Sequence, residues 1–186
     1  DRQGLLVIDQ RLSMFFGSSL AMKSVTAAQA GAIGAWRILG VSDRIGGIVF
    51  NDTDMAEVRP QRSRRAVLNL LGQIVAQNQA LGVGRGIVSA PAMLNRALER
   101  ARRLALHDAT VIVISDFDGA DEFTRRMVAD MARHNSVIAL LVHDPLQSEL
   151  PASARMTVTD GELQIVLEVG RESVRKNIQE VTEARL

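Results

Sequence analysis

Short runs of apolar residues alternate along the chain with longer stretches in which apolar residues recur every three or four positions. Three of the runs are rich in branched side chains and end in polar residues, namely Leu5 to Ile8, Val111 to Ile114 and Val137 to Val142. Such runs are typical of strands buried in a parallel sheet. A further strand is expected from Arg44 to Phe50, and a short edge strand from Met55 to Arg59.

The longer stretches predict helices, because their apolar residues fall on one face at a period of 3.6 residues. They cover Leu20 to Leu39, Ser63 to Leu81, Ser89 to Leu106 and Glu122 to Arg133. We expect Ile33 and Trp36 to be core residues, and Ser89 to cap the third helix. Alternating strands and helices predict βαβ units, and therefore an α/β fold with a doubly wound, mostly parallel sheet.

The chain changes character after Val142. Arg155 to Thr159 and Glu162 to Val169 are joined by Asp160-Gly161, which is a strong signal for a β-hairpin. The tail from Arg171 carries apolar residues at helical spacing. We therefore expect one domain over residues 1–170, closed by the hairpin, and a C-terminal amphipathic helix over residues 171–186.

The composition narrows the classes of function. The 186 residues carry a net charge of +1, which gives no strong attraction to nucleic acid or to a membrane surface. Only 3% are aromatic, too few for base stacking, and the absence of cysteine excludes thiolate metal sites. No apolar run is long enough to span a bilayer. Because the chain begins at Asp1 without a signal peptide, we expect a cytoplasmic fragment of a longer protein.

Two of the predicted strands end in aspartate, at Asp9 and Asp116. Ligand sites of doubly wound sheets lie at the carboxyl ends of the strands, so we expect the two carboxylates to face one crevice. Arg11 and Ser13 alternate with Asp9 on the following loop. Carboxylates and hydroxyls are the ligands that Mg²⁺ prefers, so the residues alone leave open whether the crevice holds a metal ion or a salt bridge.

Four segments occur in an order that points to a known family: V-I-D-Q-R-L-S-M-F-F-G-S with Lys23, S-D-R-I-G-G-I-V-F, V-I-S-D-F and H-D-P-L-Q-S-E-L-P. With them the chain resembles the von Willebrand factor A-like fold, a Rossmann-like sheet. More closely, it resembles a bacterial family of unknown function that is often encoded beside MoxR-type AAA+ ATPases. The resemblance implies a protein-interaction role with such an ATPase in the assembly or maturation of other proteins.

The metal-ion-dependent adhesion site of that fold uses D-x-S-x-S, a threonine on a second loop and an aspartate on a third. Carried over by position, Asp9, Ser13 and Asp116 match this pattern. Arg11 stands where the first serine belongs, and the position of the threonine falls near Ala92. Two of the five ligands are therefore missing from the pattern.

Arg11 argues against a metal ion, because a guanidinium has five donors and no lone pair. Placed between Asp9 and Asp116, it would satisfy the carboxylates that a metal ion would bind. Ser89 could supply a hydroxyl if the second loop is shifted. We predict a degenerate site without metal or other cofactor, made of Asp9, Arg11, Ser13, Ser89, Asp116 and Asp118. The alternative is that Arg11 points to solvent and the site binds Mg²⁺ weakly.

The segment Asp116-Phe117-Asp118-Gly119 also resembles the D-x-D-G motif of haloacid dehalogenase-like phosphatases, in which the first aspartate is a nucleophile and the second a general acid. The residue after the glycine is Ala120 where that family has threonine, and the downstream acidic pair is absent. We therefore predict a non-enzymatic protein-interaction module with a protein partner. A Mg²⁺-dependent phosphatase using Asp116 and Asp118 is the alternative.

Overall fold

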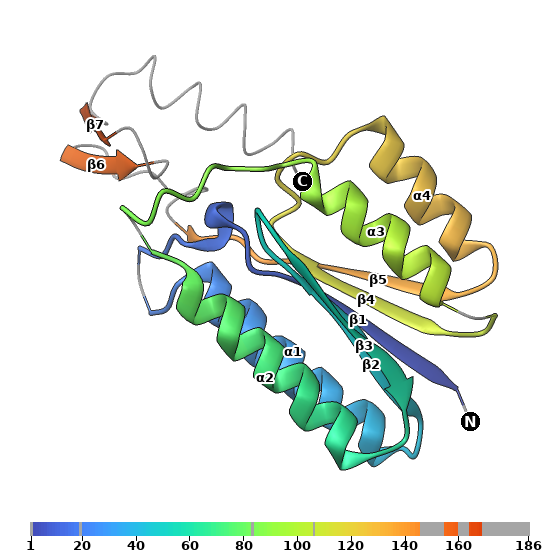
Figure 1. Cartoon of the computed structure of the whole chain (residues 1–186). Helices are drawn as coiled ribbons and strands as arrows, with labels where there is room; N and C mark the ends of the chain where they lie inside the picture. Colours follow the sequence, from blue (N-terminus) through green and yellow to red (C-terminus); the bar gives the residue numbers. More distant parts are fainter. Residues whose placement is uncertain are drawn as a thin grey trace.

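Five strands form a single sheet in the order β3-β2-β1-β4-β5 (Figure 1). The computed structural model describes residues 2–18, 20–82, 84–105 and 107–145, together with the backbone of two later strands. The sheet strands are β1 (Gln3–Asp9), β2 (Arg44–Phe50), β3 (Met55–Gln61), β4 (Thr110–Ser115) and β5 (Ser136–Leu141). All neighbours pair in parallel except β3, which runs antiparallel to β2. The predicted α/β class and mostly parallel sheet are confirmed.

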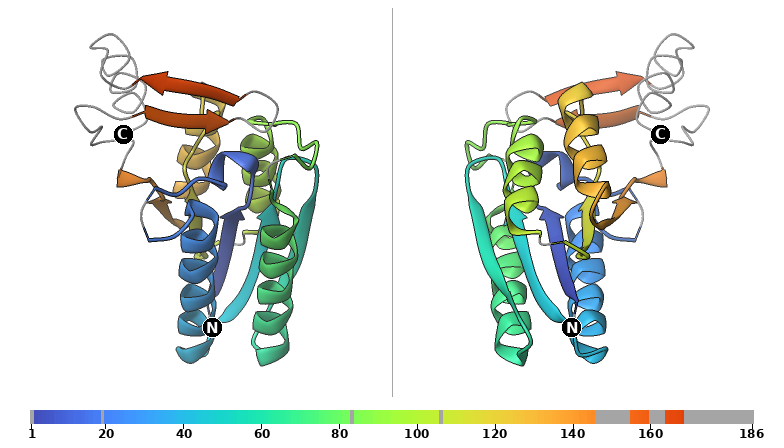
Figure 2. Two further views of the ribbon diagram at one scale, coloured as in Figure 1. Left: turned by 90° about the vertical axis from the view of Figure 1, so that its left-hand side faces the viewer. Right: turned by 90° about the vertical axis from the view of Figure 1, so that its right-hand side faces the viewer.

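Helices cover both faces of this sheet (Figure 2). On one face lie α1 (Lys23–Gly40) and α2 (Arg64–Ala80), and on the other lie α3 (Met93–Leu104) and α4 (Glu122–Ala132). A short 3-10 helix, η1 (Leu12–Met14), follows β1. Ser63 caps α2 by accepting a hydrogen bond from the backbone of Ala66, so α2 begins where the sequence predicts it.

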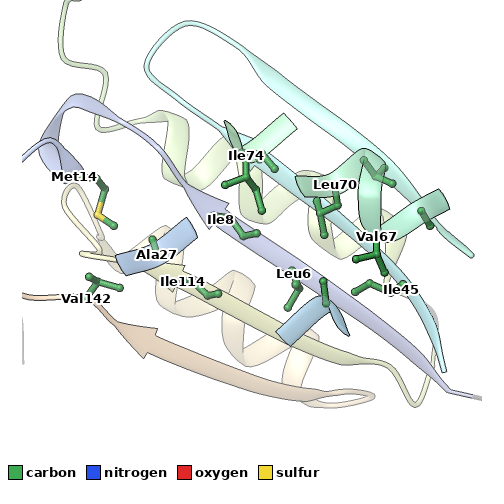
Figure 3. Packing of buried hydrophobic residues seen from close by; sticks show 14 residues of the cluster. Leu6, Ile8, Met14, Ala27, Ile45, Val67, Leu70, Ile74, Ile114 and Val142 are labelled. Atoms are coloured by element: carbon green, nitrogen blue, oxygen red, sulfur yellow. The ribbon is translucent and has the colours of Figure 1, made fainter. Parts of the chain in front are cut away.

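Every residue of β1 is buried, because β1 is the central strand and has helices on both sides. Alternate side chains point to opposite faces of the sheet. Leu6 and Ile8 pack under α1 and α2, against residues such as Leu70 (Figure 3). Leu5 and Val7 point to the other face and belong to the core under α3 and α4. The two cores hold β1 firmly, and with it the start of the loop that follows Asp9.

The prediction that Ile33 and Trp36 are core residues is wrong, since they are 71% and 39% exposed. The buried face of α1 consists of small residues, including Ala27, Gly31 and Ala35. A Cβ atom at Gly31 would lie 2.6 Å from Cδ1 of Ile8, which shows how closely the helix approaches the sheet. Small residues are needed for that approach, so Ile33 and Trp36 lie on the outer face of α1.

The predicted cap at Ser89 is also wrong. The third helix begins at Met93, its N-cap is Ala92, and no side chain caps it. Ser89 is exposed and lies in the loop that precedes the helix. This loop crosses the carboxyl ends of the strands before α3 starts, so the serine and proline that resemble a helix start belong to the loop.

The outer strands differ from the predictions as well. The apolar run predicts a buried β5, but Ile138 and Leu140 are 48% and 39% exposed. The physical reason is that β5 is an edge strand packed by α4 on one side. On the other edge, β3 continues through Pro60 to Gln61, which an edge strand tolerates because the missing N–H is needed by no further neighbour.

Two strands after the main sheet, β6 (Arg155–Thr159) and β7 (Gln164–Glu168), pair antiparallel with each other. The hairpin predicted for this part of the chain is therefore confirmed, with a shorter second strand. The predicted turn at Asp160-Gly161 and the predicted tail helix over residues 171–186 lie outside the described residues.

Candidate functional site

Three loops meet at the carboxyl ends of the central strands. They span residues 10–22 after β1, 81–92 before α3, and 116–121 after β4. Because β1 and β4 are neighbours in the sheet, Asp9 and Asp116 are brought to the same edge, as their positions in the sequence predict. The side chain between them is Arg11, which is only 1% exposed and is the largest fully buried side chain among the described residues.

Arg11 makes a paired hydrogen bond with Asp9. Its Nη2 lies 2.7 Å from Oδ2 of Asp9, and its Nε lies 3.0 Å from Oδ1. The backbone N–H of Arg11 also donates to Oδ1, at 2.9 Å. Parallel bonds of this kind between a guanidinium and a carboxylate are shorter and stronger than neutral hydrogen bonds. Asp9 therefore fixes both the side chain and the backbone of Arg11.

The other end of the guanidinium reaches the two remaining loops. Nη1 donates to the backbone carbonyl groups of Pro91, at 3.0 Å, and Asp118, at 2.9 Å. Nη2 lies 3.6 Å from Oδ1 of Asp116, within ion-pair distance. The guanidinium also lies over the ring of Phe50, 5.5 Å from its centre. One side chain thus ties together all three loops and contacts the end of β2.

Asp116 is held by a second set of donors. Its Oδ2 accepts a hydrogen bond from Nζ of Lys23 at 2.8 Å, and both side chains are 4% exposed. Its Oδ1 accepts from the backbone N–H of Asp118 at 3.0 Å and from Oγ of Ser13 at 3.3 Å. Two carboxylates and two cations are therefore buried together, and their formal charges cancel.

The loop after β4 has an unusual backbone. Phe117 has a φ of +55°, a left-handed conformation that costs a residue with a side chain free energy. Its N–H donates to Oγ of Ser115, which itself donates to Oδ2 of Asp9 at 2.6 Å. Gly119 has a φ of +78°, and a Cβ atom there would lie 2.5 Å from Cβ of Pro91. The loops are therefore pressed together around the guanidinium.

Two further aspartates fasten the same loops at their outer ends. Asp52 accepts hydrogen bonds from the backbone of Leu12, at 2.6 Å, and of Ala90, at 2.8 Å. Asp144, which follows β5, accepts from both the backbone and the hydroxyl of Ser18. Both aspartates are buried, so these bonds are shielded from water.

The electrostatics follow from burial and from the two cations. Burial raises the pKa of Asp9 above its usual value, although the hydrogen bonds and charge of Arg11 act in the opposite direction. Burial also acts to raise the pKa of Asp116, but the charge and hydrogen bond of Lys23 outweigh it and the pKa is lowered. For Arg11, burial is opposed by the bonds with Asp9, and its pKa is raised, so the guanidinium is charged at any pH that the fold tolerates.

Of the six site residues predicted from the sequence, the structure brings together Asp9, Arg11, Ser13, Asp116 and Asp118. Ser89 is exposed and is not one of the donors or acceptors that form the site. Sequence reasoning missed Lys23, Ser115, Asp52, Asp144 and the carbonyl of Pro91. Lys23 had a signal, because it is one of only two lysines and stands at the start of a helix behind the loop.

The buried ion pairs and hydrogen bonds of the site hold three loops to one another. In the part of the chain that the structure describes, no group of three or more acidic, histidine or cysteine side chains is placed to hold a metal ion. Within the same residues, no helix has the length and apolar character needed to cross a membrane.

Comparison with known proteins places the chain in a family. Residues 1–185 match the family model described as "Protein of unknown function DUF58", so the chain belongs to this family. It is 31% identical over 163 residues to an uncharacterized protein of Mycobacterium tuberculosis (Rv1480), a match that covers 88% of this chain and 49% of that protein. The chain therefore spans about half the length of the curated relatives it matches.

Solved structures resemble the chain in fold alone. The crystal structure of the conserved hypothetical protein BatB from Bacteroides thetaiotaomicron has a TM-score of 0.58 at 15% identity, covering 98% of this chain and 87% of that one. An aerotolerance-related membrane protein from Bacteroides fragilis gives a TM-score of 0.58 at 14% identity, covering 98% and 89%.

Proposed function

We propose that this member of the DUF58 family is a non-enzymatic protein-interaction module with a von Willebrand factor A-like fold. In its adhesion site, Arg11 takes the place of a metal ion. The observation that carries the proposal is the reach of one buried guanidinium, which binds Asp9, the carbonyl of Pro91 and the carbonyl of Asp118 on three different loops. A bound cation would draw the same loops together, but it could be lost, whereas an arginine is permanent.

A magnesium ion does not fit these residues. Both oxygen atoms of Asp9 accept hydrogen bonds from Arg11, and both oxygen atoms of Asp116 accept from Lys23, Ser13 or backbone. A cation placed between the carboxylates would meet the positive charge of the guanidinium and of Lys23. The free energy needed to displace two buried cations exceeds the binding free energy of a weak metal site.

No observation favours the phosphatase alternative. A nucleophilic aspartate must be reachable by the phosphoryl group, but Asp116 is 4% exposed and both of its oxygen atoms are hydrogen-bonded. Asp118 contributes its backbone carbonyl to Arg11, which fixes the loop on which a general acid would have to move.

The expected partner is a MoxR-type AAA+ ATPase, which the family resemblance implies. The surface available to it is the rim of the three loops, because their inner side chains are committed to the ion cluster. Val88, 66% exposed, and Leu20, fully exposed, are large apolar residues on this rim. Exposed apolar residues on loops held in one conformation are suited to binding a partner without an ordering cost.

The proposal is tested by measuring binding of a purified MoxR-type AAA+ ATPase from the same host to the wild type and to Val88→Asp and Leu20→Asp. We expect both variants to bind at least about tenfold more weakly, equivalent to 1.4 kcal/mol, and to unfold at the wild-type temperature. The affinity, measured without nucleotide, should be the same in Mg²⁺ and in EDTA, because Arg11 and not a metal ion holds the loops.

Val41→Asp is the matched control, since Val41 is also an exposed apolar residue but follows the C-terminal end of α1, far along the helix from the loops of the rim. Equal loss of binding in this control would mean that the rim is not the binding face. Turnover of an aryl phosphate that disappears in Asp116→Asn would overturn the non-enzymatic assignment.

A further inference from the structure

The two helical faces of the molecule differ sharply in charge. On one face, α3 has five charged residues among twelve and α4 has four among eleven. Most of their arginines are paired with acidic side chains, as in Arg102 with Asp130 and Arg103 with Glu99. On the other face, α1 has no charged residue between Lys23 and Arg37, and α2 has none after Arg65. Solvent-exposed helices normally carry charges on their outer side.

The uncharged face contains a groove between α1 and α2. Its volume is about 430 Å³, and Val25, Ala28 and Ala32 of α1 face Leu71, Ile74 and Val75 of α2 across it. The remaining lining side chains are uncharged amides. The two helices run side by side along the molecule (Figure 2). The exposed residues Ile33, four positions after Gln29, and Leu68, three before Leu71, stand at helical spacing from the lining and extend it as an apolar strip.

α2 also has an exposed glycine on this strip. Gly72 lies between Leu68 and Val75 on the same side of the helix, and a Cβ atom there would meet nothing within 4 Å. A glycine inside a helix costs roughly 1 kcal/mol relative to alanine. Packing within the described chain does not require it, but a helix lying across the strip could approach closely at this point.

The strip ends at a cluster of arginines. Arg37 at the end of α1 and Arg64 and Arg65 at the start of α2 are exposed, and Arg64 lies over the ring of Trp36, 5.8 Å from its centre. None of the three forms an ion pair with an acidic side chain in the described ranges, in contrast to the arginines of α3 and α4. The cluster and the strand-end site lie at opposite ends of the molecule (Figure 1).

We infer that the strip between α1 and α2 is a docking surface for a partner α-helix with an uncharged apolar stripe and acidic residues at one end. Val75 and Arg64 are eleven residues apart on α2, which is about 16 Å along a helix axis. A helix of three or more turns therefore places apolar side chains in the groove and its acidic end on the arginines. The concave groove favours a helix over a flat membrane surface. This surface lies on the helices and adjoins the loop rim of the proposed function only at the start of α1 and the end of α2.

The chain has one tryptophan, Trp36, and no tyrosine, so intrinsic fluorescence reports on the arginine end of the strip alone. The probes are two synthetic 18-residue helical peptides with a leucine stripe in an alanine background. One carries two glutamates at its N-terminus, and the other carries them at its C-terminus. Matched peptides carry two lysines instead, or a scrambled stripe. We expect a glutamate peptide to change the Trp36 emission and to bind at least about tenfold more tightly than its two matched peptides.

Val75→Asp should weaken binding of that peptide at least about tenfold, whereas Phe123→Asp on α4 should leave it unchanged. The double variant Arg37→Glu with Arg65→Glu should prefer the lysine peptide, which a general loss of folding cannot produce. Equal binding of all peptides, or no effect of Val75→Asp, overturns the inference.

Three other occupants would also overturn it. Vesicles of phosphatidylcholine and phosphatidylglycerol that shift the emission when no peptide does would identify a membrane surface. Self-association that disappears in Val75→Asp would identify a second copy of the chain. Peptide binding that appears only in the Ile178→Asp variant of the full chain would identify the C-terminal tail as the occupant of the strip. None of these outcomes alters the test of the loop rim, whose variants lie elsewhere.

Discussion

At the scale of single residues, the most informative feature is the guanidinium of Arg11, a charge buried between two carboxylates. Removing two charges from water is expensive, and the cost is recovered only when every donor and acceptor is satisfied. Arg11 meets that condition, because Nε, Nη1 and Nη2 all have acceptors at hydrogen-bond or ion-pair distance. Its removal should therefore be much more harmful than removal of a surface arginine.

We expect Arg11→Ala to lower the free energy of unfolding by about 3–5 kcal/mol, because Asp9 and Asp116 would face each other with one cation fewer. Urea unfolding of the wild type and the variant at neutral pH measures the loss. Arg100→Ala is the matched control, since Arg100 is half exposed and paired with Glu57. Surface pairs contribute at most about 1 kcal/mol. Similar losses in the two variants would mean that Arg11 is not a structural centre.

Lys23→Met is predicted to make stability depend on pH in a defined direction. Lys23 is the largest influence that lowers the pKa of Asp116, so in the variant burial dominates and that pKa rises. A raised folded pKa means that the folded variant binds a proton more tightly than the unfolded chain, and its deficit is greatest at neutral pH. The deficit should shrink as the pH falls toward the raised pKa. In the wild type the lowered pKa acts oppositely, and stability from Asp116 is lost only in acid, below about pH 4.

Urea midpoints from neutral to mildly acidic pH test this expectation. The double variant Lys23→Met with Asp116→Asn should recover much of the loss, since it leaves no unpaired carboxylate. A deficit that is constant with pH, or a double variant no better than the single one, would show that Lys23 acts by packing alone.

At the scale of elements, two glycines illustrate how the same substitution can have opposite effects. Gly119→Ala should destabilise the protein by about 1–2 kcal/mol for the left-handed backbone alone, with more from the contact of its Cβ with Pro91. Gly72→Ala should stabilise it by about 1 kcal/mol, because Gly72 is helical and its surroundings are open. Thermal unfolding of the two variants measures both signs. A destabilising Gly72→Ala would mean that the helix needs a glycine there.

The elements that the sequence predicted well are those whose pattern is local. The runs that form β1 and β4 are bounded by polar residues, and their order along the chain was enough to bring Asp9 and Asp116 together. The predictions that were wrong concern burial, which depends on neighbours that are distant in sequence. Trp36 is exposed because glycine and alanine form the buried face of α1, and β5 is half exposed because it ends the sheet.

In the site too, the residues with a local sequence signal could be predicted, and those that depend on the fold could not. Arg11 could be predicted between the aspartates because a D-x-S-x-S position is filled by a residue without lone pairs. The contribution of Pro91 could not, because it comes from a backbone carbonyl on a loop eighty residues away. Lys23 is one of the residues that carry the family resemblance, but only the fold shows that its Nζ lies 2.8 Å from Oδ2 of Asp116. The prediction for Ser89 failed because the N-cap is Ala92, three residues later than the cap signal suggests.

At the scale of the whole molecule, the domain has a charge-neutral cluster at one end. At the other end, an uncharged helical face leads to arginines that form no ion pair with any described residue. Long helices on both faces and a central strand buried along its whole length connect the two ends. Such a body is expected to bind partners with little change of shape, and the state of its strand-end site should not depend on a metal ion.

The last prediction is that Mg²⁺ does not stabilise the wild-type protein. A ligand at 100 times its Kd adds about 2.7 kcal/mol, which for a chain of this size raises the unfolding temperature by about 5–10 °C. Melting in millimolar Mg²⁺ and in EDTA should therefore coincide for the wild type. Arg11→Ser restores the pattern D-x-S-x-S over residues 9–13, and together with Lys23→Met it leaves both carboxylates free of cations. We expect Mg²⁺ to raise the unfolding temperature of this double variant, because hard cations bind carboxylate and hydroxyl oxygens. A clear rise in the wild type would show that Arg11 does not replace the ion.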